Sequence, residues 1–308
     1  MMKLSIIIPS YNGKLLLEKN LPPVIESLEY LKNSTEIIVV DDASLDGTSD
    51  WLTKSYPKIK IVKNQHNLRF GQSCNQGVNA ASGELVVLLN NDVSPHRDFL
   101  VSLLKHFFDP EVFAVGCREI NQSGGKEIIG GRGVSDFRRG LMIHWRPEDQ
   151  NSPQSSWVSA GSAAYRRNIW LELGGMDKLF RPAYEEDRDL CWQALKSGYK
   201  VIFESKSVVT HYHETTNIMS FGRIAISLYS LKNQLLFVWK NVSSLRLMMN
   251  HFLWLPYHLI FSTIRSQGVF LVAFFLALLQ LPEALKSRIQ AEKKWIKSDE
   301  QILALANK

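Results

Sequence analysis

Short apolar runs alternate with longer mixed segments over the first 120 residues. Five runs rich in leucine or β-branched residues occur, at Leu4–Ile8, Ile37–Val40, Ile59–Val62, Leu85–Leu89 and Phe113–Gly116. Runs of this length suit strands that are buried on both faces of a sheet. Segments of helical length separate them, over residues 14–32, 46–55, 71–82 and 96–108. Strands joined through helices predict an α/β fold with a mostly parallel sheet.

The pattern changes twice farther along the chain. Residues 118–156 carry many glycines and few apolar runs, which predicts a loop-rich, partly mobile segment. An α/β pattern then returns, with helices expected near Asn168–Leu173 and over Glu186–Ser197 and a strand over Lys200–Phe203. From residue 221 onward, long apolar stretches predict helices. We therefore expect an α/β domain over residues 1–220 and a helical region over residues 221–308.

The helical region combines apolar stretches with positive charge. Its stretches at Ile224–Trp239, Leu245–Ile264 and Val269–Leu281 do not supply the ~20 apolar residues that a membrane-spanning helix needs. They predict helices that lie in, or dip into, one leaflet of a bilayer. The pattern of the tail, Glu283–Lys308, predicts a basic amphipathic helix. A buried helical subdomain or a dimer interface over Leu245–Leu281 is the alternative.

The charge of the chain supports a membrane rather than nucleic acid as its partner. The net charge is +6, but residues 220–308 hold 11 Lys or Arg against 4 Asp or Glu. Basic character alone would suggest nucleic acid, yet this basic third is also the most apolar part of the chain. That combination favours an anionic membrane surface. With 45% hydrophobic residues, the composition excludes collagen-like and largely disordered chains.

Polar residues follow the predicted strands directly, where a parallel sheet binds its ligands. Pro9–Asn12 follows the first strand, Asp41 and Asp42 end the second, and Asn90–Asp92 follows the fourth. Carboxylates in such places can bind a nucleobase or ribose hydroxyls, and hard oxygen ligands can hold Mg²⁺ or Mn²⁺ between two phosphates. Taken singly, each motif is also an ordinary loop, helix N-cap or turn.

Three further motifs carry candidate chemistry. Arg69, in a loop that leads to Gly71, could pair with a diphosphate or simply be solvated. Four carboxylates within residues 185–189 begin a helix, where the helix dipole favours acids. Carboxylates that raise one another's pKa can also serve as a general base. His211, two residues before His213, is a candidate metal ligand, although a lone histidine is more often structural.

Together, in this order and spacing, the motifs resemble the family 2 glycosyltransferases, enzymes of the GT-A fold class. The resemblance covers about residues 1–215 and continues weakly through residues 231–241, a stretch similar to the membrane-proximal helix of bacterial rhamnosyltransferase-like members. The matching segments are Ile6–Asn12, Val39–Thr48, Asn67–Gly71, Leu88–Asp92, Gly174–Asp177 and Glu186–Trp192.

The resemblance implies a set of site residues. It implies Asp187, within Glu186-Asp187, as the catalytic base, and Asp92 and His211 as ligands of a divalent metal, Mg²⁺ or Mn²⁺. The first acid of the family's Asp-x-Asp motif is Asn90 here, a poorer metal ligand. The residues expected to bind the nucleotide sugar, with Asp41 or Asp42 on the base and ribose, are Pro9, Tyr11, Asn12, Asp41, Asp42, Arg69, Gly71, Asn75, Asn90 and Asn91.

The resemblance also implies an activity. We expect an inverting transferase that moves one sugar per encounter, because the Gln-x-x-Arg-Trp motif of processive synthases is absent. The expected donor is a nucleotide-diphosphate sugar, with UDP- and dTDP-sugars favoured, and the expected acceptor is lipid-linked or a glycan, at the cytoplasmic face of the cell membrane. The alternatives are a sugar nucleotidyltransferase, whose Gly-rich phosphate loop is missing after the first strand, and a non-catalytic module that binds a nucleotide sugar.

Overall fold

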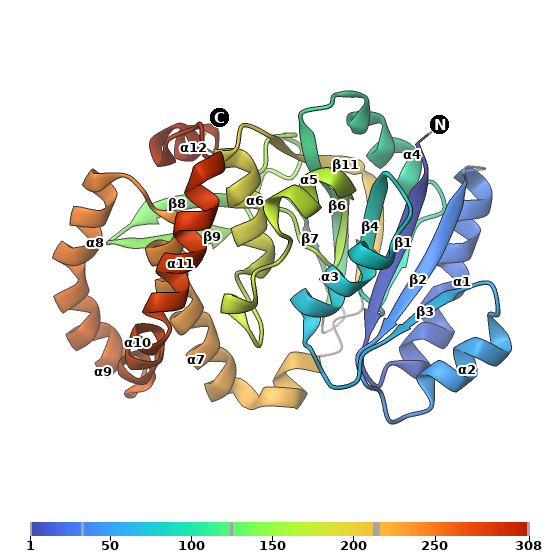
Figure 1. Ribbon diagram of the computed structural model, residues 1–308, viewed down its shortest axis with the longest axis horizontal. Coiled ribbons are helices and arrows are strands. Elements are labelled where there is room, and N and C mark those ends of the chain that lie inside the picture. Colours follow the sequence, from blue (N-terminus) through green and yellow to red (C-terminus); the bar gives the residue numbers. More distant parts are fainter. Residues whose placement is uncertain (1, 32–33, 124–125, 212–215, 307–308) are drawn as a thin grey trace.

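A mixed sheet forms the centre of the molecule, as the computed structural model of the chain shows (Figure 1). The structure describes residues 2–31, 34–123, 126–211 and 216–306. Within them the strands run in the order β3-β2-β1-β4-β10-β6-β11-β5, and β7 pairs with β6. Their bounds are β1 Leu4–Ser10, β2 Thr35–Asp41, β3 Lys60–Lys63, β4 Leu85–Leu89, β5 Val93–Pro95, β6 Val112–Ser123, β7 Lys126–Gly130, β10 Ser162–Arg166 and β11 Lys200–His211.

The parallel part of the sheet accounts for the continuous apolar runs in the sequence. β1 lies between β2 and β4, parallel to both, and every residue of β1 and β4 is buried. Successive side chains of β1 enter two different cores: Ile7 packs with one set of helices, and Ile6 and Ile8 pack with the other. The predicted α/β fold is thereby confirmed. β10 and β5 run antiparallel to their neighbours, so the sheet is mixed.

Helices cover both faces of the sheet. Buried residues of α1, α2 and α4 form one core with the sheet, and those of α3, α5 and α6 form the other. This second core continues into the C-terminal helices, through residues 235–242 and Phe270. The bounds of these helices are α1 Lys14–Leu31, α2 Thr48–Ser55, α3 Phe70–Ala80, α4 Phe99–Leu104, α5 Arg167–Leu173 and α6 Glu186–Lys196.

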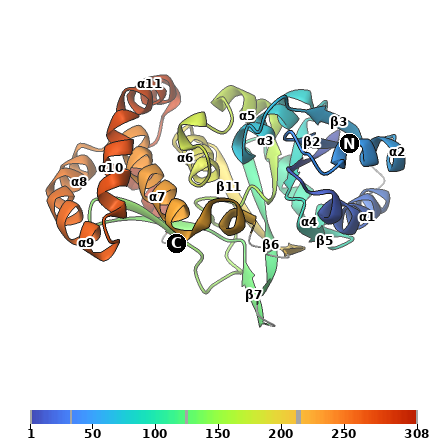
Figure 2. The same cartoon turned by 90° about the horizontal axis from the view of Figure 1, so that it is seen from below.

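The C-terminal helices lie at the end of the molecule away from β1, β2 and β3 (Figures 1 and 2). α7 packs against α6, β9, α10 and α11 and joins them to the α/β part. A π-helical turn over His258–Ser262 connects α8 to the short α9. The bounds are α7 Thr216–Asn241, α8 Leu245–Tyr257, α9 Thr263–Arg265, α10 Val269–Leu279, α11 Leu281–Ala291 and α12 Asp299–Ala306.

The expectation of a loop-rich segment over residues 118–156 was wrong. β6 and β7 pair over much of it, and β8 (Val134–Arg138) pairs with β9 (Leu141–Trp145) as a separate ribbon. Arg139 and Gly140 join these two strands with φ of 49° and 75°. Two consecutive positive φ values are what a tight hairpin turn requires, and glycine meets that need readily. Glycine here therefore marks a turn between strands rather than a loop.

The expectation of one amphipathic helix over Glu283–Lys308 was also wrong. α11 ends at Ala291, and the chain turns back onto α6 before α12 begins. Asp299 at the start of α12 accepts a hydrogen bond from Lys196 Nζ of α6 at 2.7 Å, and both side chains are fully buried. Asp299 also accepts from the backbone N–H groups of Ser243 and Ser244. This buried ion pair is a tertiary contact that a helical pattern does not encode.

Within the described residues, no single helix has both the length and the apolar character to cross a membrane. One bent pair, α10 followed by residues 281–294 at an angle of 59°, meets the two requirements together.

We predict that Asp299→Ala lowers the free energy of unfolding by about 3–5 kcal/mol, because it leaves the Lys196 ammonium buried without its counter-ion. Urea denaturation followed by circular dichroism measures this loss. Glu292→Ala is the matched control, since Glu292 is exposed and pairs with Arg288 at 3.6 Å, and it should cost less than about 1 kcal/mol. A loss at Asp299 no larger than at Glu292 would contradict the assignment.

Candidate active site

The carboxyl ends of β1, β2 and β4 meet at one edge of the sheet, because these strands are parallel and in register. Ser10 at the end of β1 lies opposite Asp41 of β2, and Ile7 lies opposite Leu88 of β4. The loops that follow the three strands therefore adjoin, and these loops carry most of the residues predicted to bind a nucleotide sugar. Pro9 is buried within β1, whereas Tyr11 is 43% exposed.

A hollow of about 330 Å³ opens beside the loop after β2. Asn12 joins this loop to the one after β1: its N–H donates to Ser44 Oγ at 2.9 Å, and its Oδ1 accepts from Leu45 N at 2.8 Å. Asp41 lines the hollow, accepts from the N–H of Ser44 at 2.9 Å and accepts from the hydroxyl of Ser49. The hollow is large enough for part of a nucleotide, and the residues that line it include two acids, Asp41 and Asp50, and three with hydroxyl groups, Ser44, Thr48 and Ser49.

Asp42 is buried and turned toward a different loop. Its Oδ1 accepts from Leu68 N and Asn64 Nδ2, both at 2.7 Å, and its Oδ2 accepts from Arg69 N at 2.9 Å. The carboxylate thus holds the backbone of the 64–69 loop, including Arg69 with its φ of 69°. Asp42 fixes the loop that presents Arg69, and a contact of Asp42 with the nucleotide remains a prediction.

The start of α3 meets the acid-rich segment at residues 185–189. A Cβ at Gly71 would lie 3.3 Å from Met176 Cβ and 3.5 Å from Glu186 Cγ, so glycine permits this close approach. Arg69, Gly71 and Glu186 line one narrow recess. Asn75 uses its amide to bond the backbone N–H and carbonyl of Met176, at 3.0 and 2.8 Å. Asn75 anchors α3 to the segment before α6, and its role in binding a nucleotide remains a prediction.

The turn after β4 brings the two expected metal ligands together. His211 Nε2 lies 3.1 Å from Asp92 Oδ1, although the two residues are 119 positions apart. The pairing of β5 with β11 places them there, because Val93 lies opposite His211. Asn91 Nδ2 donates to Ser10 Oγ at 3.0 Å, which fixes the turn on β1. His213, the other histidine of this motif, lies outside the described residues.

A buried acid that the sequence analysis missed lies near this pair. Glu119 in β6 is fully buried, accepts from Ser162 Oγ at 2.6 Å and pairs with Arg146 at 2.6 Å. Burial opposes a charged imidazole, but the hydrogen bond to Asp92 and the charges of Asp92 and Glu119 raise the pKa of His211. Glu119 stands in the middle of a long strand rather than after one, so the strand-end pattern could not indicate it.

The acid-rich segment holds two adjacent carboxyl groups, those of Glu186 and Asp187, whose pKa values are raised by different surroundings. Burial and the charge of Asp187 raise the pKa of Glu186 to about 8. Burial also raises the pKa of Asp187, with Glu185 adding to the effect and Arg188 opposing it. Asp187 accepts hydrogen bonds from the backbone N–H groups of Arg188, at 2.8 Å, and Ala160. Such bonds favour the ionised form of Asp187.

Residues 160–161 connect the acid-rich segment to the turn after β4. The N–H of Ala160 donates to Asp187, while the carbonyl of Gly161 accepts from Asn90 N at 2.9 Å. A Cβ at Gly161 would lie 2.7 Å from Asn90 Nδ2, so the loop and the turn are in close contact. The sequence analysis missed this loop, because a backbone donor leaves little trace in residue type.

Asp92 and His211 fit a divalent ion by their chemistry. A carboxylate oxygen and an imidazole nitrogen, held at the same point of the sheet edge, are donors that Mn²⁺ accepts, and the carboxylate suits Mg²⁺. No group of three or more His, Cys, Asp or Glu side chains suited to a metal occurs within the described residues.

Comparison with known proteins identifies the family. The model of the glycosyl transferase family 2 matches residues 5–173. The chain belongs to glycosyl transferase family 2. The pre-mycofactocin glycosyltransferase of Mycobacterium tuberculosis is 29% identical over 180 residues, which are 58% of this chain and only 38% of that protein. The O-antigen chain rhamnosyltransferase RfbN of Salmonella typhimurium is 24% identical over 226 residues, 72% of this chain and 70% of that one.

Solved structures of low sequence identity share the GT-A fold with this chain. GalNAc-T7 with UDP, GalNAc and Mn²⁺ aligns at a TM-score of 0.61 with 20% identity, over 78% of this chain and 48% of that one. The mannosyltransferase PcManGT of Pyrobaculum calidifontis with GDP-Man and Mn²⁺ aligns at a TM-score of 0.57 with 20% identity, over 99% of this chain and 85% of that one. Staphylococcus aureus TarS 1-349 with UDP-GlcNAc aligns at a TM-score of 0.60 with 15% identity, over 99% of this chain and 91% of that one.

The raised pKa of Glu186 has a consequence for stability. A carboxyl whose pKa rises from 4.5 to about 8 on folding binds an extra proton in the folded state across that range, so it destabilises the fold as pH rises. We predict that Glu186→Gln raises the free energy of unfolding by at least about 1 kcal/mol at pH 9 and changes it little at pH 5. Urea titrations at both pH values measure this, with Glu292→Gln as the control. An equal effect of Glu186→Gln at the two pH values would refute the raised pKa.

Proposed function

We propose that this family 2 glycosyltransferase moves a hexosyl or deoxyhexosyl group from a nucleotide-diphosphate donor to a hydroxyl of a lipid-linked or polysaccharide acceptor. The reaction would invert the anomeric configuration and would serve cell-surface polysaccharide synthesis. Support comes from the relatives, which include O-antigen chain rhamnosyltransferases and an O-antigen biosynthesis protein of Myxococcus xanthus. UDP- and dTDP-sugars are the proposed donors, and the UDP-containing neighbours support the first of these.

One observation carries the proposal: the loop at residues 160–161 holds the acid-rich segment and the turn after β4 side by side. Ala160 bonds to Asp187, and Gly161 bonds to Asn90, two residues before Asp92. A group able to take a proton thus adjoins a group able to hold a diphosphate through an ion. Glycosyl transfer needs both at the reacting carbon, one for the attacking hydroxyl and one for the leaving group.

The proposed roles follow from charge. Asp187 would accept the proton of the acceptor hydroxyl as its oxygen attacks the anomeric carbon. Arg69, which Asp42 presents through the backbone, would face the diphosphate as negative charge develops there. A divalent ion held by Asp92 and His211 would stabilise the same charge when bound. Asp41, with Asn12 shaping the adjoining loop, would bind the nucleoside in the hollow after β2.

Asp187→Asn is expected to lower the rate of transfer by about 10²–10⁴, because it removes the proton acceptor while keeping the shape of the side chain. Binding of the nucleoside diphosphate should stay within about threefold of the parent, since the base acts only in the chemical step. The rate of transfer is measured as the release of nucleoside diphosphate from a nucleotide-sugar donor in the presence of an acceptor extract. Binding of the nucleoside diphosphate is measured by isothermal titration calorimetry.

Asp109→Asn is the control for that experiment, because Asp109 pairs with Lys200 at the surface and lies in none of the loops that follow β1, β2 or β4. The configuration at the anomeric carbon of the product, read by NMR, should be opposite to that of the donor. Turnover by Asp187→Asn within tenfold of the parent would remove Asp187 from the role of base, and a retained configuration would exclude a single displacement.

The metal site gives a separate prediction. A nucleoside diphosphate at ~100 times its dissociation constant should stabilise the parent chain by roughly 2.7 kcal/mol, which raises its melting temperature by a few degrees. We expect this shift for UDP or dTDP with Mn²⁺ or Mg²⁺ and a much smaller one in EDTA. Asp92→Asn should lose the part of the shift that depends on metal. An equal loss with and without metal would show that Asp92 is not a ligand.

A further inference from the structure

Large apolar side chains cover the outer faces of α8, the π-helical turn, α9 and α10. They recur on successive turns of α8 and α10, while other residues of the same helices are buried against the rest of the molecule. α8, α9 and α10 lie together at one end of the molecule in two perpendicular views (Figures 1 and 2). We call this surface the apolar end; its most exposed members are Leu245, Met249, Phe252, Leu253, Ile264 and Leu279.

A soluble helix normally presents polar residues on its outer face, and α10 does not. Phe270, Ala273 and Ala277 are its buried residues, and α10 packs mainly on α7, yet Val272 and Phe275 remain 52% and 57% exposed. All 11 residues of α10 are apolar. At 1.5 Å per residue this helix is about 16 Å long, roughly half of the ~30 Å hydrocarbon core of a bilayer. It suits a position within one leaflet.

Positive charge predominates around the apolar end, although Arg246 Nε lies 3.7 Å from a carboxylate oxygen of Glu300 and Arg138 pairs with Asp136 at 2.7 Å. No Asp or Glu occurs from residue 215 to residue 282, whereas the same span holds five Lys or Arg, of which Lys232 and Lys240 are buried. Arg246 and Arg265 are exposed on α8 and α9. From the turn between β8 and β9, the guanidinium of Arg139 lies over the rings of Trp254 and Tyr257, with its carbon 5.8 and 5.9 Å from their centroids.

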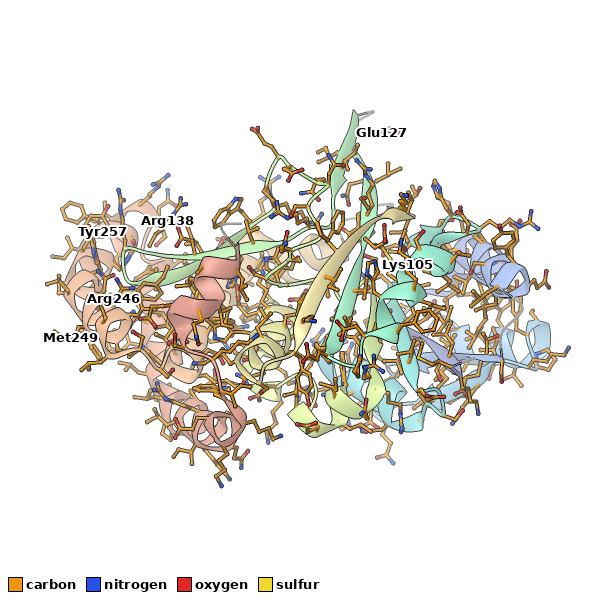
Figure 3. The ribbon with its side chains drawn as sticks, turned by 90° about the horizontal axis from the view of Figure 1, so that it is seen from above. Lys105, Glu127, Arg138, Arg246, Met249 and Tyr257 are labelled. Carbon is orange, nitrogen blue, oxygen red and sulfur yellow. The ribbon has the colours of Figure 1, made fainter. Side chains whose placement is uncertain are left out.

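Figure 3 shows Arg138, Arg246, Met249 and Tyr257 at this same end of the molecule. Cations beside tryptophan and tyrosine, at the rim of an apolar surface, are the side chains found at the level of lipid headgroups.

We propose that the apolar end docks into the headgroup region of an anionic lipid bilayer. The apolar side chains would enter one leaflet, and the arginines would meet the phosphates of anionic lipids. A second copy of the chain fits this surface less well. A two-fold interface brings the same patch from both subunits together, so the arginines of both copies would gather in one interface. The proposal rests on this surface alone and is independent of the proposed function.

Flotation with lipid vesicles tests the proposal on the full chain. We expect the parent to float with vesicles of phosphatidylcholine and phosphatidylglycerol, to bind those of phosphatidylcholine alone several-fold less, and to lose binding as salt rises. The triple variant Leu253→Gln, Ile264→Gln and Leu279→Gln should bind at least about tenfold less, because it removes apolar area that would leave water. Arg246→Gln and Arg265→Gln should each weaken binding about fivefold, and only to the anionic vesicles.

The control replaces exposed apolar side chains that lie elsewhere, Phe108 (83% exposed) and Leu171 (42% exposed), in one double variant. Phe108→Gln at the end of the segment after α4 and Leu171→Gln on α5 should leave flotation unchanged. Circular dichroism of each variant confirms folding, which these surface changes should preserve.

Two results would overturn the proposal. One is a loss of flotation in the variant that carries Phe108→Gln and Leu171→Gln as large as the loss in the triple variant. The other is a parent chain that binds neither kind of vesicle and elutes as a dimer, while the triple variant elutes as a monomer. A second copy of the chain would then cover the apolar end. Neither result concerns sugar transfer, so this proposal and the proposed function can fail separately.

Discussion

The acid-rich segment depends on one helix, α7, that lies beyond it in the chain. The amide of Asn233 donates to three backbone carbonyls within residues 180–184, at 2.6 to 2.9 Å. Lys240 donates to Asp177 at 2.8 Å and to Asp189 at 2.7 Å. Burial opposes the ammonium ion, but the two carboxylates raise the pKa of Lys240. These bonds fasten both ends of the segment that carries Glu186 and Asp187, and a buried ion pair of this kind is strongly destabilising when one partner is lost.

This dependence bears on the domain boundary expected at residue 220. A chain ending there would leave Asp177 and Asp189 buried without Lys240, and would lose the hydrophobic core that residues 235–242 share with the sheet. The helical region is therefore part of the scaffold of the candidate site, not an appendage to it. The family model ends at residue 173, before the acid-rich segment, so the match itself does not include the residues whose positions α7 fixes.

The sequence could predict the strands and the sheet edge for a simple physical reason. Strands buried on both faces must be apolar throughout, and parallel strands bring their carboxyl ends to one edge, which placed Asn12, Asp41 and Asp92 near one another. Contacts between distant elements lie outside that pattern. The resemblance, not the spacing, pointed to His211 beside Asp92. No pattern separated Asp42, which holds backbone, from Asp41, which lines the hollow. Backbone donors such as Ala160 N–H and the buried acids Glu119 and Asp299 depend on tertiary packing.

The adjacent carboxylates of Glu186 and Asp187 both have raised pKa values, but their surroundings differ. Burial pushes both toward the neutral form, and the charge of Asp187 further disfavours ionisation of Glu186, whereas for Asp187 the added like charge is that of Glu185. They differ in their hydrogen bonds. One carboxylate oxygen of Glu186 is buried without a hydrogen-bond partner, whereas Asp187 accepts from two backbone N–H groups and lies near the charge of Arg188. Glu186, with a pKa of about 8, keeps its proton near neutral pH, while the hydrogen bonds and Arg188 favour the ionised form of Asp187. A base must be ionised before it can accept a proton, so this asymmetry, set by the backbone of Ala160 and Arg188, favours Asp187 over its neighbour for that role.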